Sequence, residues 1–287
     1  MMNIVEKGYG KINLALAITG RRADGYHNID TIFQSIGLCD AVTMSEADAF
    51  ELTCSQPSLA CDETNLAYKA WKALCPYKKD NQQVAIHIEK HIPIAAGLAG
   101  GSTDCAAVLR GLNRLWGLGL SEKELCRIGA GLGADVPFCI CGGTMRGTGI
   151  GEELKRLPPL PAWPVVIVHP RVPVQTKQAY ALFDSRSHTA PVAVDTVEQA
   201  VRAGDFQGLT AAMGNTFEEL VIPNVPQVAD CQQRLTALGL QPLMAGSGPT
   251  VFALVPPGQE EIVRSQAAWH DVDVYMTAIV KRVEGER

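Results

Sequence analysis

The sequence lacks the features that mark nucleic-acid-binding, membrane and secreted proteins. Its 287 residues include only 19% charged side chains, carry a net charge of −5, and contain no basic run longer than pairs such as Arg21-Arg22 and Lys78-Lys79. A nucleic-acid surface needs clustered cations to neutralise phosphates. No stretch reaches the roughly 18 uninterrupted apolar residues of a membrane span. The N-terminus also lacks the apolar segment of a signal peptide. We therefore expect a soluble, cytoplasmic protein that binds neither nucleic acid nor membrane.

The sequence also lacks any Cys-x-x-Cys pair, although it contains nine cysteines. The tightest spacing is Cys139-x-Cys141, and Cys105, Cys126 and Cys139 all lie within apolar runs. A free cysteine in such a run behaves as a small hydrophobic residue. In a reducing compartment this spacing predicts neither a disulfide framework nor a metal site built from cysteine.

What the sequence does contain is enough apolar material for a large core. Apolar residues make up 47% of the chain, and there is no internal repeat or low-complexity tract. The length fits two domains that share one cleft, at about 100–200 residues per domain. Four prolines fall within residues 156–164, where neither a helix nor a central strand can continue. We place the boundary there and predict domains at 1–157 and 158–287, in a monomer or weak homodimer.

The first half mixes amphipathic strands with helices, which predicts an α+β domain. Residues 12–18 alternate as a half-buried strand, and Val84, Ile86 and Ile88 repeat that pattern. Residues 102–116 change to the helical period. Ser121 and Glu124 form a capping box that opens another helix, which ends near Gly131.

The second half opens with a buried strand at 165–168. Helical stretches are predicted near 175–183, 195–203, 224–238 and 259–269, and further strands near 250–255 and 272–280. The simplest arrangement of these elements is two helices packed on a small antiparallel sheet.

The segment from Pro93 to Thr103 carries the strongest functional signal. It follows a predicted strand, runs directly into the helix at 102–116, and contains Gly97, Gly100 and Gly101. Glycines allow backbone N–H groups to approach an anion closely, and a helix start adds unpaired donors and partial positive charge. A polyphosphate is the natural occupant, although a turn packed against a neighbour would use the same residues. The segment is neither a Walker A nor a dinucleotide motif.

Two charged residues and a second glycine-rich segment add to this signal. Period-2 geometry puts Lys11 and Asn13 on the same strand face. Asp135 lies at a bend held by Pro137, just beyond the helix that ends near Gly131. Taken singly, the lysine could face solvent, and the aspartate could cap a helix or a turn. The segment from Met244 to Thr250 precedes a strand and could close a cleft over a ligand or serve as an ordinary turn.

These segments, in this order, resemble the motifs of the GHMP kinase family, which includes galactokinase, homoserine kinase and mevalonate kinase. The match covers nearly the whole chain. It implies an ATP-dependent kinase that phosphorylates a small-molecule hydroxyl, with ATP and Mg²⁺ as cofactors. It also implies an N-terminal domain like the second domain of ribosomal protein S5 and a ferredoxin-like C-terminal domain. The loop that the resemblance assigns to the ATP phosphates consists of Pro93, Ile94, Ala95, Ala96, Gly97, Leu98, Ala99, Gly100, Gly101, Ser102 and Thr103.

A further segment, Thr19 to Gln34, is similar to a motif of one branch of the family, which phosphorylates a cytidyl diphosphate alcohol in isoprenoid precursor synthesis. In that branch Tyr26 would stack on the cytosine and His27 would read its edge. From the residues alone, the two form an exposed aromatic pair after an Asp-Gly turn. The remaining residues that the resemblance implies for substrate binding are Asn13, Thr176, Tyr180, Gly246 and Ser247.

The resemblance also implies a division of catalytic roles. Asp135 would take the proton of the acceptor hydroxyl, and Lys11 would keep Asp135 ionised and stabilise the transferred group. No metal cage made of protein groups alone is expected, since Mg²⁺ relies on phosphates and water, with Ser102 as a candidate ligand. Ala95, Ala96 and Ala99 stand where many members have glycine. Alanine favours right-handed or extended backbone, so we expect this loop to be stiffer.

Three alternatives remain open at this point. Another GHMP kinase, acting on homoserine or a mevalonate-like acid, would be expected to present arginine near the acceptor rather than the Tyr26-His27 pair. A non-catalytic nucleotide sensor would not need both Lys11 and Asp135. A non-enzymatic scaffold would leave the two glycine-rich loops without a reason.

Overall fold

The computed structural model describes residues 3–79, 82–186 and 189–281. The first half of the chain contains the strands β1 (Asn3–Arg21), β2 (His27–Ala47), β3 (Glu51–Cys54), β4 (Gln83–Glu89), β5 (Thr144–Thr148) and β6 (Glu153–Arg156). Its helices are α1 (Leu66–Leu74), α2 (Gly100–Leu115), α3 (Glu122–Ala130) and α4 (Val136–Cys141), with a short 3₁₀ turn at Cys75–Tyr77.

The second half adds the strands β7 (Pro164–His169), β8 (Gly214–Asn215), β9 (Pro242–Met244), β10 (Val251–Leu254) and β11 (Asp273–Ala278). Its helices are α5 (Thr176–Asp184), α6 (Val194–Ala203), α7 (Phe206–Ala212), α8 (Glu218–Val221), α9 (Pro226–Ala237) and α10 (Glu260–Gln266), with a 3₁₀ turn at Ile222–Asn224. The predicted helices and strands are present. Ten elements were not predicted: the strands β2, β3, β5, β6, β8 and β9 and the helices α1, α4, α7 and α8. Apart from β2 and α1, these have two to seven residues and carry too little periodicity.

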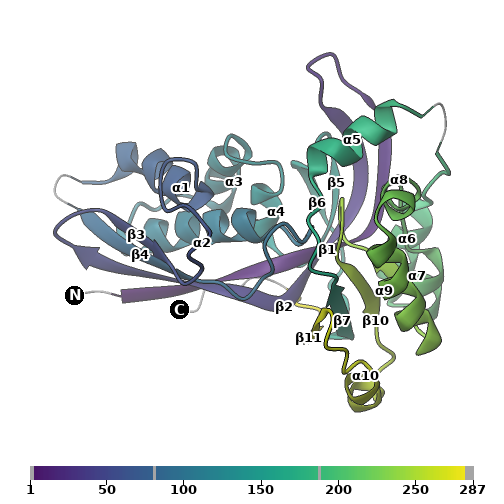
Figure 1. Ribbon diagram of the computed structural model, residues 1–287. Helices are drawn as coiled ribbons and strands as arrows, with labels where there is room; N and C mark the ends of the chain where they lie inside the picture. Colours follow the sequence, from purple (N-terminus) through teal and green to yellow (C-terminus); the bar gives the residue numbers. More distant parts are fainter. Residues whose placement is uncertain (1–2, 80–81, 187–188, 282–287) are drawn as a thin grey trace.

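The first sheet is built around two long antiparallel strands, β1 and β2. The order β3-β4-β2-β1-β8 is extended by β5, which pairs with β2, and by β6, which pairs with β5. Figure 1 shows α1 to α4 stacked on one face of these strands, while the second half of the chain gathers around the far end of β1. The capping box of α3 is confirmed, because Ser121 Oγ accepts from Glu124 N at 3.3 Å and Ser121 N donates to Glu124 Oε2 at 2.8 Å.

The prediction that residues 12–18 form a half-buried strand is wrong about burial. Every residue from Gly10 to Leu16 is buried, although their side chains point to both faces of the sheet. Ile12, Leu14 and Ala15 belong to a core that also contains Val165 and Ile167 of β7. The second domain therefore covers the face of β1 that the first domain alone would leave exposed to solvent. For this reason the polar residues of β1 lie in the interior.

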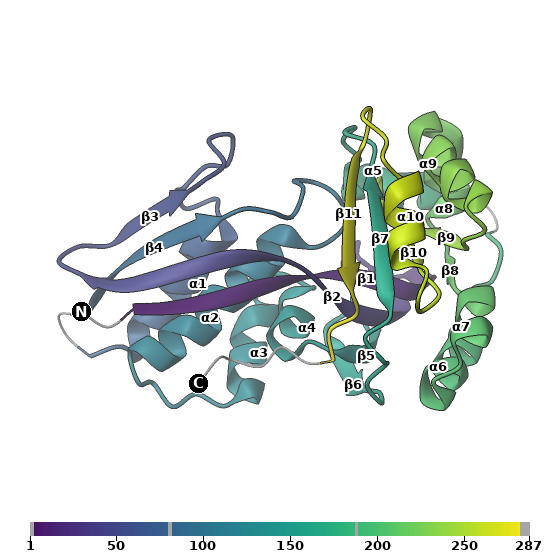
Figure 2. The same ribbon diagram turned by 90° about the horizontal axis from the view of Figure 1, so that it is seen from below.

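The second sheet has the order β11-β7-β10-β9, and all of its pairs are antiparallel. Numbered by position in the chain, its strands run 4-1-3-2, which is the ferredoxin-like arrangement. Helices α9 and α10 lie against this sheet, with Val228 and Val263 in the same core as Val166 (Figure 2). The two-domain α+β fold is therefore confirmed.

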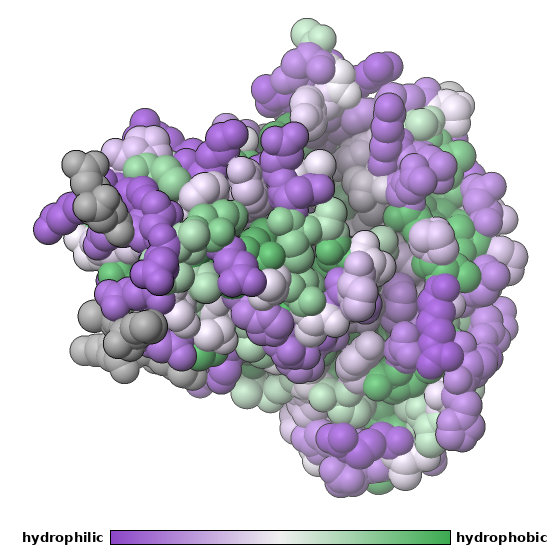
Figure 3. All heavy atoms as spheres, turned by 60° about the vertical axis from the view of Figure 1, so that its left-hand side comes forward, coloured by the Kyte–Doolittle hydropathy of each residue, from purple (hydrophilic) through white to green (hydrophobic). Residues whose placement is uncertain are grey.

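The proline-rich segment lies between β6, which ends at Arg156, and β7, which begins at Pro164. The exact boundary at 157/158 stays a prediction, because chain beyond it returns to the first sheet: β8 pairs in parallel with β1 through Gly214 and Asn215. In Figure 3, apolar side chains gather in the middle of one face and are surrounded by hydrophilic ones. Within the described ranges, no helix is both long and apolar enough to cross a lipid bilayer.

Candidate active site

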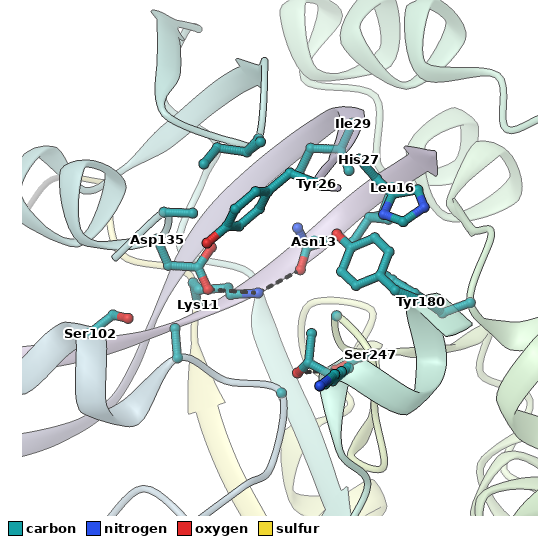
Figure 4. A pocket seen from close by; sticks show the side chains of 18 of the residues that line it. Lys11, Asn13, Leu16, Tyr26, His27, Ile29, Ser102, Asp135, Tyr180 and Ser247 are labelled. Atoms are coloured by element: carbon teal, nitrogen blue, oxygen red, sulfur yellow. Dashed lines mark hydrogen bonds and ion pairs between the residues drawn. The ribbon is translucent and has the colours of Figure 1, made fainter. Parts of the chain in front are cut away.

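A cavity of about 790 Å³ lies where the two domains meet. Its walls come from β1, the turn between β1 and β2, the start of α2, the residues before α4, helix α5 and the loop after β9. These segments are far apart in the sequence. Figure 4 shows their side chains converging on one space.

Lys11 forms the floor of this cavity. Its side chain comes from the buried middle of β1 and is 5% exposed. Nζ donates to Asn13 Oδ1 at 2.9 Å, which confirms that the two residues share a face. The Asn13 amide donates in turn to Thr31 Oγ1 at 2.8 Å, and Thr31 donates to the carbonyl of Ala15 at 2.6 Å. A buried amine needs such partners, and this chain of hydrogen bonds fixes its position.

Asp135 reaches the same point from the other side. It is the N-cap residue of α4, but its side chain makes no capping hydrogen bond. Instead, the carboxylate lies with Oδ2 3.8 Å from Lys11 Nζ and remains 36% exposed toward the cavity (Figure 4). Burial, together with the charge of Asp135, raises the pKa of the Tyr180 phenol to about 12. The side chain of Asp135 therefore faces the cavity beside a buried amine instead of capping α4.

The glycine-rich loop is pinned between the two domains. Lys11 N donates to the carbonyl of Leu98 at 3.1 Å, which ties the loop to β1. A side chain at Gly97 is impossible, because its Cβ would lie 2.3 Å from the carbonyl oxygen of Ala245. Helix α2 begins at Gly100 and has no side-chain cap, so its first N–H groups remain available to a ligand. Gly100, Gly101 and Ser102 line the cavity beside them.

The expectation that alanine would keep this loop in right-handed or extended backbone is wrong. Ala95 and Ala99 have φ values of 54° and 61°, in the left-handed region. This conformation costs an alanine about 1–2 kcal/mol. The contacts of the loop with β1 and with the loop after β9 therefore impose the geometry that glycine adopts freely.

Not every predicted loop residue reaches the cavity. Ala95, Ala96, Gly97 and Ala99 line it. Leu98 and Thr103 are each 1% exposed and serve as packing residues. Pro93 and Ile94 lie on the outer side of the loop, along a separate depression.

Sequence reasoning missed a buried ionic cluster beneath the start of α2. Lys90 Nζ lies between Asp40 Oδ2 and Asp104 Oδ2, the latter at 2.7 Å. Asp40 Oδ1 also accepts from the backbone N–H groups of His91 and Ile92 at 2.6 and 2.8 Å. Burial raises the pKa of Asp104 to about 7. The one available signal was Asp104 itself, an acidic residue among the apolar positions of the predicted helix.

The loop after β9 brings Gly246 and Ser247 to the cavity. Ser247 Oγ shares a hydrogen bond of 2.9 Å with Thr176 Oγ1 at the start of α5. The Asn215 amide donates to the carbonyls of Met244 and Gly246 at 2.8 and 2.7 Å. Asn215 was not predicted, because β8 is too short to recognise from the sequence.

The far end of the cavity is aromatic. Tyr26, in the turn between β1 and β2, is 62% exposed. His27 is 6% exposed and stacks on Tyr180, with ring centroids 4.7 Å apart and planes inclined by 16°. Its Nε2 lies 2.7 Å from Asp184 Oδ1, a partner that the sequence did not reveal. In Figure 4 the ring of Tyr180 lies beside Asn13, and the ring of Tyr26 points toward Asp135.

Comparisons with known proteins place this site in a family context. The sequence model of the GHMP kinases N terminal domain matches residues 65–143, and that of the GHMP kinases C terminal domain matches residues 197–270. The chain is 39% identical over 289 aligned residues to the 4-diphosphocytidyl-2-C-methyl-D-erythritol kinase of Enterococcus faecalis, an alignment covering 98% of this chain and all of that protein.

Solved structures agree with the sequence comparisons. A crystal structure of 4-(cytidine 5'-diphospho)-2C-methyl-D-erythritol kinase superimposes with a TM-score of 0.81 at 30% identity, covering 96% of this chain and 99% of the other. Homoserine kinase from Cytophaga hutchinsonii gives a TM-score of 0.76 at 18% identity, with coverage of 99% and 96%. At 18% identity, the match with homoserine kinase shows a shared fold only.

Proposed function

The chain belongs to the GHMP kinase family, and we propose that it transfers the γ-phosphoryl group of ATP to the 2-hydroxyl of 4-diphosphocytidyl-2-C-methyl-D-erythritol. That the protein is an ATP-dependent small-molecule kinase follows from the family itself. The choice of acceptor and the roles of individual residues are our proposal. The reaction would belong to non-mevalonate isoprenoid precursor synthesis.

One observation carries the proposal: the cavity joins a Lys11–Asp135 pair to an open helix start at one end and to an aromatic cluster at the other. The helix start suits a triphosphate. The aromatic cluster suits a pyrimidine, because ring faces stack on ring faces. The pair between them lies where a hydroxyl and a phosphate would meet.

Asp135 acts as the base in this proposal. The uncapped carboxylate would accept the proton of the acceptor hydroxyl as the oxygen attacks the γ-phosphorus. Lys11 would stabilise the negative charge on the transferred oxygens, and Asn13 holds its amine in place through the 2.9 Å hydrogen bond. Since Lys11 is already buried and bonded, little reorganisation is needed at the moment of reaction.

The phosphates of ATP would lie along the loop from Ala95 to Ser102 and over the first N–H groups of α2. Among the described residues, no group of three or more His, Cys, Asp or Glu side chains is arranged to hold a metal. The cavity nevertheless offers a carboxylate at Asp135 and a hydroxyl at Ser102, and this sparse set fits Mg²⁺, which keeps water and phosphate ligands. When bound with ATP, Mg²⁺ would neutralise phosphate charge.

The aromatic end would take the cytidyl group. Tyr26 offers an exposed ring face, whereas His27 is fixed between Tyr180 and Asp184 and can present a polar edge. Thr176 and Ser247, hydrogen-bonded to each other, and the neighbouring Gly246 would line the diphosphate and erythritol portions. A monomer or weak homodimer stays our prediction for the working form.

The test is an assay of ADP release with purified protein, ATP and the cytidyl diphosphate substrate, with mevalonate and homoserine as parallel acceptors. We expect release with the cytidyl substrate alone, and release about 1,000-fold slower from the Asp135→Asn variant. Arg21 also lines the aromatic end, although it pairs with Asp184 at 3.5 Å, so the acid acceptors are the necessary comparison. Turnover of either acid in place of the cytidyl substrate would refute the proposed acceptor.

A further inference from the structure

Two cysteine side chains meet outside the cavity, where α3 packs against α4. The sulfur atoms of Cys126 and Cys141 are 3.4 Å apart, although the residues are 15 positions apart in the sequence. Cys126 is partly exposed, and Cys141, the last residue of α4, is 6% exposed. The closest pair in sequence, Cys139 and Cys141, is not the pair that the fold brings into contact.

The two thiols are chemically unequal. The contact with Cys141 lowers the pKa of Cys126, because a thiol that donates to the Cys126 sulfur stabilises its thiolate. Arg156 acts in the same direction and Glu122 in the opposite one, and these two are paired at 2.6 Å. The same contact, followed by burial, raises the pKa of Cys141. Either sulfur can donate in this contact, but Cys126 is the more exposed of the two, so it is the thiol that an oxidant reaches, and Cys141 lies in contact with it to resolve the product.

We propose that Cys126 and Cys141 form an oxidisable dithiol that closes to a disulfide under hydrogen peroxide and thereby slows phosphoryl transfer. The Cys126 thiolate attacks one peroxide oxygen; an S–O bond forms, the O–O bond breaks, and the departing hydroxide takes a proton and leaves as water. Cys141 sulfur then attacks Cys126 sulfur. An S–S bond replaces the S–O bond, and the hydroxyl leaves as a second water with the proton of Cys141.

The bond would act on the site through α4. Forming it brings the two sulfurs about 1.3 Å closer than the 3.4 Å contact, since a disulfide is about 2.05 Å long. All six residues of α4 are buried, so the helix is held as a rigid piece, and Asp135 is its N-cap. A displacement of about 1 Å at a reacting group can lower turnover by about 100-fold. The effect on turnover rests on the proposed function, whereas formation of the bond does not.

The experiment oxidises the purified protein with graded hydrogen peroxide, alkylates the remaining thiols, and maps the peptides by mass spectrometry beside an ADP-release assay. We expect a linked peptide joining residues 126 and 141, a loss of about tenfold or more in turnover, and recovery with dithiothreitol. Cys61→Ser, which removes another partly exposed thiol, should behave like wild type. Cys126→Ser and Cys141→Ser should keep wild-type turnover when reduced and resist the peroxide.

The proposal fails if peroxide links other cysteines and leaves this pair reduced, or if the linked protein turns over at the wild-type rate. It also fails if Cys126→Ser is inactivated as readily as wild type. Should either variant fold poorly, the peptide map of the wild-type protein still decides whether the bond forms. If that bond forms while the cytidyl substrate is not phosphorylated at all, the proposed function is refuted and the disulfide stands.

Discussion

The two ends of the cavity are built in different ways. At the end that contains the Lys11–Asp135 pair and the start of α2, where we propose catalysis (the catalytic end), Lys11 and Asn13 are 5% and 1% exposed on a strand of a sheet covered on both faces. At the aromatic end, Tyr26 is 62% exposed in a turn at the tip of the β1–β2 hairpin. The first group is held by a chain of hydrogen bonds within the core, whereas at the aromatic end His27 is held by its stack on Tyr180 and its contact with Asp184.

The difference reflects what each end has to do. Phosphoryl transfer depends on charges that are in position before the reaction, which a packed interior provides. Recognition of a base depends on ring faces that solvent and substrate can reach. We therefore expect substitutions at the catalytic end to act on kcat, and those at the aromatic end to act on KM for the acceptor. The following predictions test that division, from the largest expected effect to the smallest.

Asp135→Asn should lower kcat by about 1,000-fold, because an amide cannot take up the proton of the substrate hydroxyl. ATP affinity should remain close to wild type, since the helix start that binds phosphate is intact. Steady-state kinetics and nucleotide titration measure the two effects separately. Asp184→Asn, at the aromatic end, is the matched control and should raise KM while sparing kcat. Near-normal turnover in the Asp135 variant would show that Asp135 is not the base and would contradict the division between the two ends.

Asp104→Asn tests how the buried ionic cluster beneath the start of α2 affects the stability of the fold. Burial raises the pKa of Asp104 to about 7, above its value in the unfolded chain. The folded protein therefore holds a proton that the unfolded chain has lost, and this contribution to stability is full below pH 4 and disappears as pH rises through 7. The stability of the variant should therefore depend less on pH between pH 4 and pH 8 than that of wild type.

Urea unfolding between pH 4 and pH 8 measures this difference. Wild-type stability should fall over this range as the unfolded chain loses the proton of Asp104, and the stability of the variant should fall less. Asp24→Asn, an exposed residue in the turn at the aromatic end, should leave the pH profile unchanged near neutrality. A variant whose stability falls as steeply with pH as that of wild type would contradict the role assigned to burial.

Tyr26→Ala should raise KM for the cytidyl substrate by about tenfold, the equivalent of one stacked ring face. Neither kcat nor KM for ATP should change by more than about twofold, because the ring lies at the far end from the helix start. Tyr77→Ala removes a tyrosine of similar exposure outside the cavity and serves as the control. If Tyr26→Ala changed KM for ATP and left KM for the cytidyl substrate unchanged, the proposed role of this ring in binding the base would be wrong.

Ala99→Gly should stabilise the protein by about 0.5 kcal/mol. It relieves about 1–2 kcal/mol of left-handed strain at φ 61° and loses part of that to the freer unfolded chain. Ala96→Gly is the control; its backbone φ is not positive and its buried methyl group packs in the core, so it should destabilise. Thermal unfolding compares the two. At the aromatic end the corresponding turn already uses a glycine, Gly25, at φ 87°.

How much the sequence predicted differs between the two ends. Lys11 and Asn13 were placed on one face by strand periodicity, and their hydrogen bond bears this out. Asp184 and Asn215 were not found, because each acts on a residue distant in sequence and carries no local pattern of its own. The family resemblance supplied Tyr26 and His27, and their roles in substrate binding remain predictions.

By itself, the sequence determined the α+β class, the helix that opens from a glycine-rich loop, and the capping box of α3. These depend on periodicity and on residues within one turn of each other. Only the tertiary structure decided that the middle of β1 is buried on both faces, that Ala95 and Ala99 take left-handed backbone, and that Cys126 meets Cys141. The reason is physical: packing one domain against another can override a residue's local preference, and it brings together side chains whose separation along the chain carries no signal.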